Sequence, residues 1–452
     1  MIEKLSVEIP VIEDVDVLVC GGGPAGIASA LAAARQGVKT MLIESQGCLG
    51  GVGTNCLVGI WLGSYSRDGK FPVIGGVFSE IVERLVADNA AISAQNDLSS
   101  GTSRLGYASW HGRTVPFEFE PCKRILEQIL LEAKVNVRYF TNAVTPQMEN
   151  DCIKGVFIHS KNGIEFIRTA TVIDATGDAD VAYLAGAPTV KGRKKDGFTS
   201  PTGLIFVLDN VDENKFEDYC HKTGDVRLKN IISQLKEQKC WPFIFEGVVC
   251  CRMISQGRFF INALLQLDID GTRAEDLTRG IIEGRQQAQV LFDIMRQHVP
   301  GFSKARLIQT SPVLGVRDTR RIIGQSTVTV DDISQGRQYP DTIALSGYQW
   351  DMADPKTTKQ QMKGVEIIRP YTEIPYSALV PQKIKNLIVA GRSISCEWEA
   401  LGVLRIMPAC FAMGQAVGTA ARQVVAKKIS FKDININKLR NALRQEGAIL
   451  NN

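Results

Sequence analysis

Residues Val17 to Ala30 read VLVCGGGPAGIASA, an apolar run that leads through three glycines into a stretch of small residues. The run from Val15 to Cys20 predicts a short buried strand, because it is nearly continuous in apolar residues and rich in valine. Gly21, Gly23 and Gly26 follow it in the spacing G-x-G-x-x-G. Between a strand and a helix, this spacing provides a tight turn, a close backbone approach to a pyrophosphate and close helix–strand packing. The chain is therefore expected to begin with a β-α-β unit that binds a dinucleotide.

The residues after the glycines complete this unit. A helix is expected from Pro24 to about Gln36, with its free N–H groups and positive dipole end directed at the phosphates. The run VKTMLIE is the expected second strand and ends on Glu44, at about the spacing where an acidic residue holds a ribose hydroxyl. A carboxylate there would repel a 2′-phosphate, so NADP is not expected. The motif alone does not separate FAD from NAD. No second such motif follows a strand in the middle of the chain, which disfavours a reductase with separate FAD and NAD(P)H domains.

Composition narrows the class of protein. The 452 residues, 44% hydrophobic and 22% charged, suit a soluble chain of two or three domains. The net charge of +4 is spread out, so no nucleic-acid partner is expected, and the basic stretch from Lys191 to Lys195 is interpreted as a solvated loop. No 18-residue apolar run or signal peptide is recognised, so we expect no membrane association. Eleven irregularly spaced cysteines suit a cytoplasmic location, and no metal site is expected because the four histidines lie far apart.

Three separated segments carry the features of a dinucleotide site. Besides the first, Thr169 to Pro188 contains a strand that ends in DATGD, and Asn386 to Val425 contains a strand, a glycine turn and a helix starting near Pro408. The predicted fold class is α/β, with a Rossmann-like, three-layer domain on a parallel sheet built from discontinuous segments, plus a mixed α+β substrate or cap domain. The expected boundaries are 1–60, 116–188 and 386–452 for the first domain, and 61–115 and 189–385 for the second.

Taken in order, these motifs and the runs LGVRDTRRIIG and AGRSIS…ALGVLRIMPACFAMGQAVGTAA resemble the bacterial FAD-dependent oxidoreductase family. That family is a relative of the fumarate reductase and glutathione-reductase-like flavoproteins. The resemblance implies FAD, bound non-covalently in an extended form across the Rossmann-like domain, with the second domain covering the isoalloxazine ring. Disulfide reductases carry a C-x-x-x-x-C pair after the Gly-Gly turn. Here only Cys48 and Cys56 occur, so a redox disulfide is not expected. The Asp-x-His that such proteins often show near YQWDMADP is also absent, because Ala353 stands in the histidine position.

The resemblance also implies a set of cofactor contacts. These are Gly21, Gly23, Pro24, Ala25 and Gly26 around the pyrophosphate, Glu44 and Ser45 at the adenosine ribose, Gly50 and Gly51 along the ribityl chain, Ala175, Thr176 and Gly177 near the adenosine half, Gly391 and Arg392 at the pyrophosphate, Arg405 and Met407 beside the ring, and Val144 as a further contact. The helix near Pro408 would direct its N-terminal dipole at the ring and stabilise negative charge there.

Four residues are candidates for the chemistry. His111 could act as a base, although a lone histidine is more often structural. Arg317 could clamp a substrate carboxylate with two parallel hydrogen bonds, or pair with an acid of the chain. Tyr376 could donate to a substrate carbonyl or simply pack, and Arg405 is expected beside the ring.

The leading hypothesis is an FAD-dependent dehydrogenase or reductase that moves a hydride between flavin and a small polar substrate, carboxylate-bearing in one reading. The alternative is a flavin-containing electron-transfer subunit that works with a partner redox protein. A flavin-dependent enzyme acting on nucleic acid is disfavoured by the diffuse charge. The sequence leaves the substrate, the direction of electron flow and the oligomeric state open, a homo-oligomer included.

Overall fold

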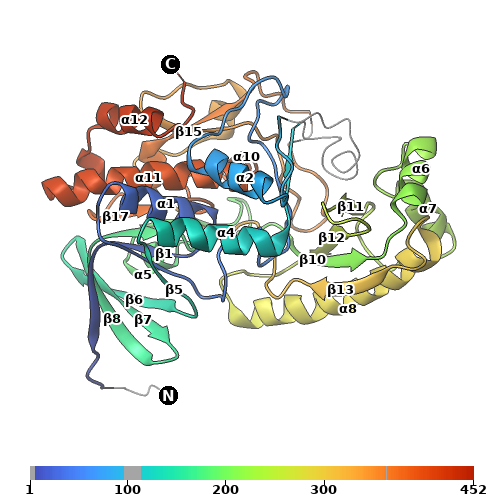
Figure 1. The fold of residues 1–452 in the computed structure, drawn as a ribbon, viewed down its shortest axis with the longest axis horizontal. Helices are drawn as coiled ribbons and strands as arrows, with labels where there is room; N and C mark the ends of the chain where they lie inside the picture. The colour runs from blue at the N-terminus through green and yellow to red at the C-terminus, as the bar shows by residue number, and fades with distance from the viewer. Residues whose placement is uncertain (1–5, 96–112, 363, 452) are drawn as a thin grey trace.

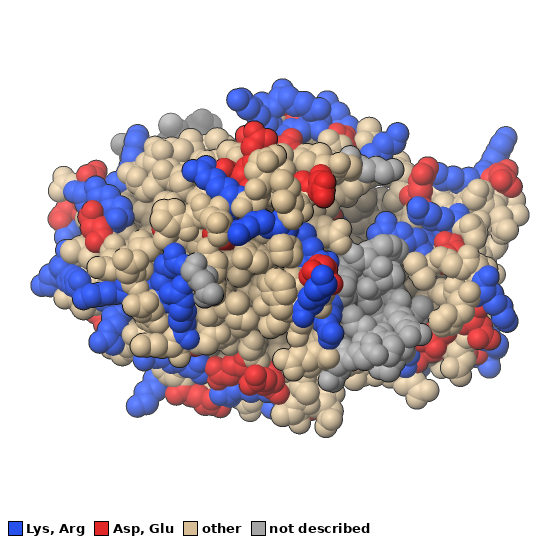
Figure 2. Space-filling model, turned by 90° about the horizontal axis from the view of Figure 1, so that it is seen from above, with Lys and Arg blue, Asp and Glu red and all other residues tan. Residues whose placement is uncertain are grey.

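The computed structural model describes residues 6–95, 113–362 and 364–451. In Figure 1 the chain divides into a larger body that holds both termini and a smaller one formed by the middle of the chain. On the face seen in Figure 2, groups of lysine, arginine and acidic side chains are scattered over a surface made mainly of other residues. No helix in the described part of the chain is long and apolar enough to cross a bilayer.

The main sheet of the larger body has seven strands within the described residues, in the order β5-β2-β1-β8-β7-β6, with β17 also paired to β8 (Figure 1). They are β1 (Val11–Cys20), β2 (Thr40–Ile43), β5 (Asn136–Arg138), β6 (Asn142–Glu149), β7 (Cys152–Ser160), β8 (Gly163–Asp174) and β17 (Leu387–Val389). Strands β5, β2, β1, β8 and β17 are parallel, whereas β6 and β7 add antiparallel pairs. Parallel strands require both faces to be covered, which explains the continuous apolar runs at Val17–Val19.

Helices cover this sheet and complete the larger body. They are α1 (Pro24–Arg35), α2 (Val77–Ala87), α4 (Phe119–Glu132), α5 (Asp180–Leu184), α9 (Val330–Ser334), α10 (Leu401–Leu404), α11 (Met407–Lys427) and α12 (Ile436–Gln445), with 3₁₀ turns at Tyr376–Leu379 and Phe431–Asp433. Three short ladders join distant segments: β3 (Ile60–Trp61) with β4 (Val115–Pro116), β9 (Thr189–Lys191) with β14 (Arg320–Ile322), and β15 (Thr342–Ser346) with β16 (Thr372–Pro375). The α/β fold with a Rossmann-like domain is confirmed.

Helices α1 and α11 pack backbone against backbone. A β-carbon added to Gly414 would lie 2.1 Å from the carbonyl oxygen of Ala25, and one added to Gly418 would lie 2.2 Å from that of Ser29. Positions four residues apart share a helix face, so both contacts belong to one seam. Since the contacts run in the same order along both helices, α1 and α11 are parallel and their N-termini point the same way.

Within the described residues, the smaller body is a four-stranded antiparallel sheet with its own helices (Figure 1). Its elements are β10 (Thr202–Asp209), β11 (Val249–Arg252), β12 (Phe259–Gln266), β13 (Arg306–Thr310), α6 (Glu213–Thr223), α7 (Lys229–Glu237) and α8 (Ala274–His298). Along β10, Leu204 and Phe206 belong to a second hydrophobic core with α8, whereas Ile205 belongs to the main core. Because successive side chains of a strand point to opposite faces, β10 has one face on each core.

The basic stretch from Lys191 to Lys195 is only partly the solvated loop that we expected. Lys194 and Lys195 are exposed, but Arg193 is 5% exposed. Its guanidinium donates to both carboxylate oxygens of Asp196 at 2.8 Å and to Asp354 at 2.6 Å. The prediction was wrong for Arg193 because its acidic partner Asp354 lies far along the chain.

Candidate active site

The turn after β1 is built so that only glycine fits two of its positions. Gly21 has a φ of +106°, and a β-carbon there would lie 2.5 Å from the carbonyl oxygen of Ala175. A β-carbon on Gly26 would lie 1.8 Å from the carbonyl oxygen of Gly21. A β-carbon on Gly23, by contrast, would meet no atom closer than the Cα of Gly51, at 3.9 Å. The first and third glycines therefore close the turn, and the second leaves open space in front of the N-terminus of α1.

Glu44 follows β2 and is anchored beside this turn. Its Oε2 accepts a hydrogen bond of 2.6 Å from the backbone N–H of Gly22, and its Oε1 accepts from the N–H of Gln46 at 2.8 Å. The residue is 8% exposed, and it lines the hollow in front of the turn. A carboxylate oxygen accepts more than one hydrogen bond, so Glu44 keeps the capacity to accept from a hydroxyl group.

The hollow is a cleft of about 540 Å³ between the two bodies, and it has two parts. The glycine-lined part, as we name it, is formed by Gly21, Gly23, Pro24, Ala25, Glu44, Ser45, Gly51, Ala175, Thr176, Gly177, Gly391 and Arg392. The arginine-lined part is formed by Gly203, Ile205, Asn262, Leu277, Val313, Leu314, Gly315, Val316, Arg317, Tyr348, Asp351, Arg405, Ile406 and Met407. Segments far apart in the sequence thus form one site.

Fourteen of the seventeen residues expected to contact the cofactor line this cleft. The other three are Gly26, Gly50 and Val144. Gly26 and Gly50 shape the backbone from behind: the N–H of Gly50 donates to the carbonyl of Gly22 at 2.9 Å. Val144 is 41% exposed and does not line the cleft, although its neighbours Asn142 and Ala143 do. The cofactor contacts themselves, Val144 included, stay predictions.

Arg392 lines the cleft but its guanidinium is engaged by the protein. Nε donates to the carbonyl of Gly177 at 2.8 Å, Nη1 to the carbonyl of Val316 at 2.6 Å and Nη2 to Asp178 at 2.5 Å. Asp178 also accepts from the hydroxyl of Thr319 at 2.6 Å. Arg392 therefore ties the glycine-lined part to the segment that carries Arg317.

Of the three arginines in GVRDTRRIIG, only Arg317 lines the cleft. Its Nη1 donates to the carbonyl of Pro201 at 2.6 Å, which holds the guanidinium against the start of β10. Arg320 pairs with Asp180 at 2.7 Å, and Arg321 is buried and donates to the carbonyls of Cys396 and Gly192. The structure thus separates one cleft-lining arginine from two that serve packing.

One of the other catalytic candidates does not line the cleft, and the second lies outside the described residues. Tyr376 is 3% exposed, does not line the cleft, and donates its hydroxyl to the carbonyl of Phe431 at 2.9 Å. This placement supports its packing role rather than a contact with substrate. His111 lies outside the described residues, so its role as a base stays a prediction.

Burial disfavours the thiolate form of three cysteines in or near the cleft: Cys48, Cys56 and Cys410. Burial raises the pKa of Cys56 to about 12 and that of Cys410 to about 12. Cys48 is half-buried, its pKa is raised mainly by burial, and its thiol lies 3.0 Å from Oδ1 of Asn55. Because the thiolate is the reactive form, none of these three residues is prepared for covalent bonding to a cofactor.

Sequence reasoning missed three acidic residues of the cleft: Asp178, Asp180 and Asp351. The pKa of Asp180 is raised to about 6, first by burial and then by the carboxylates of Asp178 and Asp174. The density of aspartates in DATGDAD was the available signal. For Asp351 there was none, because its position depends on a long loop between β15 and β16.

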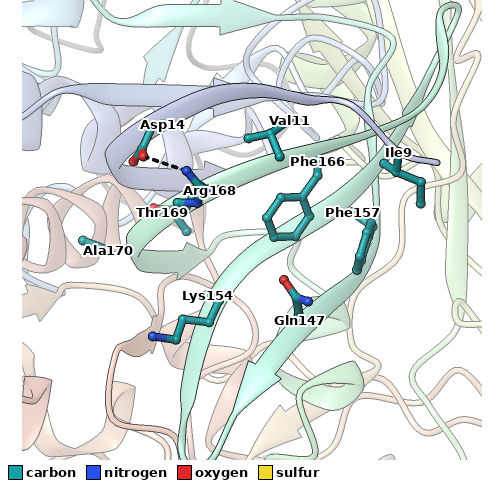
Figure 3. Close-up of a pocket in the computed structure, with 10 residues that line it drawn as sticks. All are labelled: Ile9, Val11, Asp14, Gln147, Lys154, Phe157, Phe166, Arg168, Thr169 and Ala170. Carbon is teal, nitrogen blue, oxygen red and sulfur yellow. Dashed lines mark hydrogen bonds and ion pairs between the residues drawn. The ribbon is translucent and has the colours of Figure 1, made fainter.

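A second hollow, of about 590 Å³, lies on the outer face of β7 and β8 (Figure 3). The rings of Phe157 and Phe166 contact one another there with centroids 4.7 Å apart, and Asp14 and Arg168 form an exposed ion pair at 3.4 Å. None of the predicted site residues lines it. The candidate active site is therefore the cleft.

Comparison with known proteins agrees with this geometry. A sequence model of the FAD dependent oxidoreductase family matches residues 16–443. The chain belongs to that family. It is an FAD-dependent oxidoreductase, as its resemblance implied. Comparison with curated proteins gives no match.

Several solved structures match this chain at low identity. The p-nitrophenol 4-monooxygenase PnpA from Pseudomonas putida has a TM-score of 0.50 and 11% identity, over 93% of this chain and 83% of that one. A geranylgeranyl bacteriochlorophyll reductase-like protein from Thermoplasma acidophilum has a TM-score of 0.45 and 14% identity, over 96% and 84%. The myxobacterial chondrochloren halogenase CndH has a TM-score of 0.45 and 12% identity, over 96% and 79%. The likeness to PnpA concerns the fold alone.

The residues of the cleft fit FAD. The open backbone at Gly23 and Gly51 and the N-terminus of α1 would hold a pyrophosphate, because a helix N-terminus presents free N–H groups to an anion. Glu44 would accept from the ribose. Met407 and Cys410, in the first turn of α11, line the cleft as well, so a second helix N-terminus faces the same space.

Proposed function

We propose that this oxidoreductase is a dehydrogenase or reductase that transfers a hydride between FAD and a small organic substrate carrying a carboxylate. The observation that supports the proposal is the position of Arg317 and Arg405. They come from distant segments, yet both line the cleft that contains the dinucleotide-binding turn. Two guanidinium groups in one partly apolar cleft favour an anionic ligand, because arginine binds carboxylates with two parallel hydrogen bonds.

The rest of the arginine-lined part would hold the carbon skeleton of the substrate. Ile205, Leu277 and Leu314 provide apolar surface, and Asn262 adds an amide group. Ligand sites typically combine an apolar lining with a few polar groups that fix orientation. Arg317 would set the direction of the substrate, and the apolar residues would exclude water from the reacting carbon.

When bound, FAD supplies the hydride acceptor or donor, at its N5 position. The protein contributes the electrostatic environment of the bound flavin. The N–H groups in the first turn of α11 would stabilise negative charge placed before that helix. Pro408 in this turn has no N–H, so Ala409 and its neighbours provide the donors.

The test is an anaerobic titration of the yellow holoprotein with small hydroxy acids and amino acids, and with the amide of each acid. We expect at least one acid to bleach the visible flavin absorption and its amide to fail. Variants R317M and R405M should retain FAD and lose the response. Bleaching by amides and acids alike, or by uncharged compounds only, would contradict the role of the arginines.

A further inference from the structure

In this structure a carboxylate of the chain already binds Arg405, one of the two arginines in the arginine-lined part of the cleft. Nη2 of Arg405 donates to Oδ2 of Asp351 at 3.1 Å and to the backbone carbonyl of the same residue at 2.8 Å. Both residues line the arginine-lined part. Nε of Arg405 is buried and finds no hydrogen-bond partner among the described residues. The guanidinium therefore has an unused donor next to the one that Asp351 occupies.

The backbone of Asp351 is held more firmly than its side chain. Its backbone packs against α10, because a β-carbon on Gly402 would lie 3.0 Å from the Asp351 carbonyl oxygen. One residue further along, the carbonyl of Met352 accepts from the N–H of Gln361 at 2.7 Å. On the other side, Nε of Arg67 donates to the carbonyl of Tyr348 at 2.8 Å. The segment from Tyr348 to Met352 is thus fixed at both ends.

The side chain of Asp351 is much freer than its backbone. It is 43% exposed, whereas the side chain of Arg405 is 14% exposed. The hydroxyl of Tyr348 lies 3.5 Å from Oδ2 of Asp351, at the limit of hydrogen-bond distance. Because an exposed carboxylate is readily solvated, turning it away from Arg405 costs little free energy. Arg405 would stay in place during that rotation, since the carbonyl of Asp351 continues to hold it.

We propose that the carboxylate of Asp351 occupies the position of the substrate carboxylate and is displaced from Arg405 when substrate binds. This inference rests on the proposed function, because it assigns Arg405 as a carboxylate-binding residue. Asp351 then acts on specificity. Its charge competes with every anionic ligand, so only a carboxylate whose carbon skeleton also fits the apolar lining binds well. An uncharged ligand gains nothing from the exchange.

The test measures the affinity of the holoprotein for benzoate, an apolar ring with one carboxylate, by calorimetric titration at fixed ionic strength. Asp351→Asn keeps the backbone carbonyl and the shape of the side chain but removes the charge. We expect D351N to bind benzoate about five-fold more tightly than wild type, the size typical of releasing a partly exposed ion pair. D351S should show the same direction, which guards against an effect particular to asparagine. Arg405→Met should lose most of the benzoate affinity.

Two controls test whether the change in benzoate affinity comes from the charge of Asp351. Benzamide has the same shape without the charge, so its affinity should be equal in wild type and D351N. Asp88 pairs with Arg124 at 2.5 Å, is 41% exposed and does not line the cleft. D88N should leave benzoate affinity unchanged.

The outcomes separate the two proposals. If benzoate binding depends on Arg405 but D351N binds it equally or more weakly, displacement is overturned and the proposed function stands. An equal gain for benzamide in D351N also overturns displacement, because it indicates a change of cleft shape. If no protein binds benzoate, or if R405M and R317M bind it like wild type, both proposals fail.

Discussion

The two parts of the cleft are formed by different groups of the protein, one mainly by backbone and the other mainly by side chains. The glycine-lined part consists mainly of backbone: the turn at Gly21–Gly26, the Gly51 backbone and the ends of β8 and β17. The arginine-lined part consists mainly of side chains, among them Ile205, Leu277 and Arg317, which come from β10, α8 and the loop after β13. A dinucleotide has the same phosphates whatever protein binds it, and backbone amides suffice to hold them. A substrate is distinguished by its carbon skeleton and charges, and recognising those requires side chains.

This comparison predicts different responses to substitution, and the largest is expected in the glycine-lined part. Gly26→Ala places a β-carbon 1.8 Å from the carbonyl oxygen of Gly21. The turn has to move as a unit, so we expect a loss of about 3 kcal/mol in the free energy of unfolding and a colourless protein without FAD. Urea denaturation and the visible spectrum measure the two effects.

A matched control for this variant is Gly37→Ala, at the end of α1. Gly37 has a φ of +81°, but a β-carbon there meets no atom within 4 Å. Only backbone strain remains, which costs about 1 kcal/mol, and FAD should stay bound. A G26A protein that is yellow and as stable as G37A would show that the turn accommodates the added methyl group. The close contact at Gly26 would then not be required for FAD binding.

In the arginine-lined part, substitution should affect substrate and leave the cofactor in place. Arg317→Met should lower kcat/KM for a carboxylate substrate about 100-fold, because a charged hydrogen-bonding partner is lost, while FAD content and stability stay near wild type. The control is Arg306→Met on β13, whose partner Asp209 lies outside the cleft-lining residues. R306M should leave kcat/KM unchanged. Loss of FAD from R317M would contradict the division of the cleft into two parts.

The same division explains how much could be predicted from sequence. The turn after β1, the helix that it begins and the acid after β2 depend on residues within about one β-α-β unit, so spacing alone locates them. The close packing of α11 on α1 depends on small residues four positions apart, Gly414 and Gly418, whose partner helix is known only from the structure. Fold class and cofactor were therefore predicted correctly.

Side-chain neighbours across the chain could not be predicted in this way. Nothing near Asp351 indicates that it meets Arg405, and nothing near Arg193 indicates that it meets Asp354. Tyr376 has the sequence context of a strand end, and its burial against Phe431 follows only from the packing of the C-terminal segment. Each of these contacts joins residues far apart in the sequence, and the path of the loops between them is not encoded in a periodic pattern.

A milder substitution in the arginine-lined part sharpens the comparison further. Gly203→Ala would place a β-carbon 3.2 Å from Nη1 of Arg317. A flexible side chain can shift by a few tenths of an ångström, so we expect KM for a carboxylate substrate to rise about three-fold with FAD content unchanged. In the control Gly247→Ala the nearest atom is at 3.7 Å, an ordinary contact, and KM should not change. A kcat that falls while KM stays constant would place Arg317 elsewhere than at the bound substrate.

The smallest effect is expected at Asp180, on the border of the two parts, where it pairs with Arg320. Burial and the neighbouring carboxylates raise its pKa from the ordinary value to about 6, so the folded state binds this proton more tightly than the unfolded state does. The stability that the proton provides is complete below about pH 4 and is lost as pH rises through about 6. Asp180→Asn should therefore raise Tm relative to wild type at about pH 8 and leave it unchanged at about pH 4. Because the side chain is 46% exposed, solvent screens the charge and the gain should stay below about 1 kcal/mol. A D180N protein that is less stable at about pH 8 would show that the ion pair with Arg320 outweighs the cost of ionising Asp180.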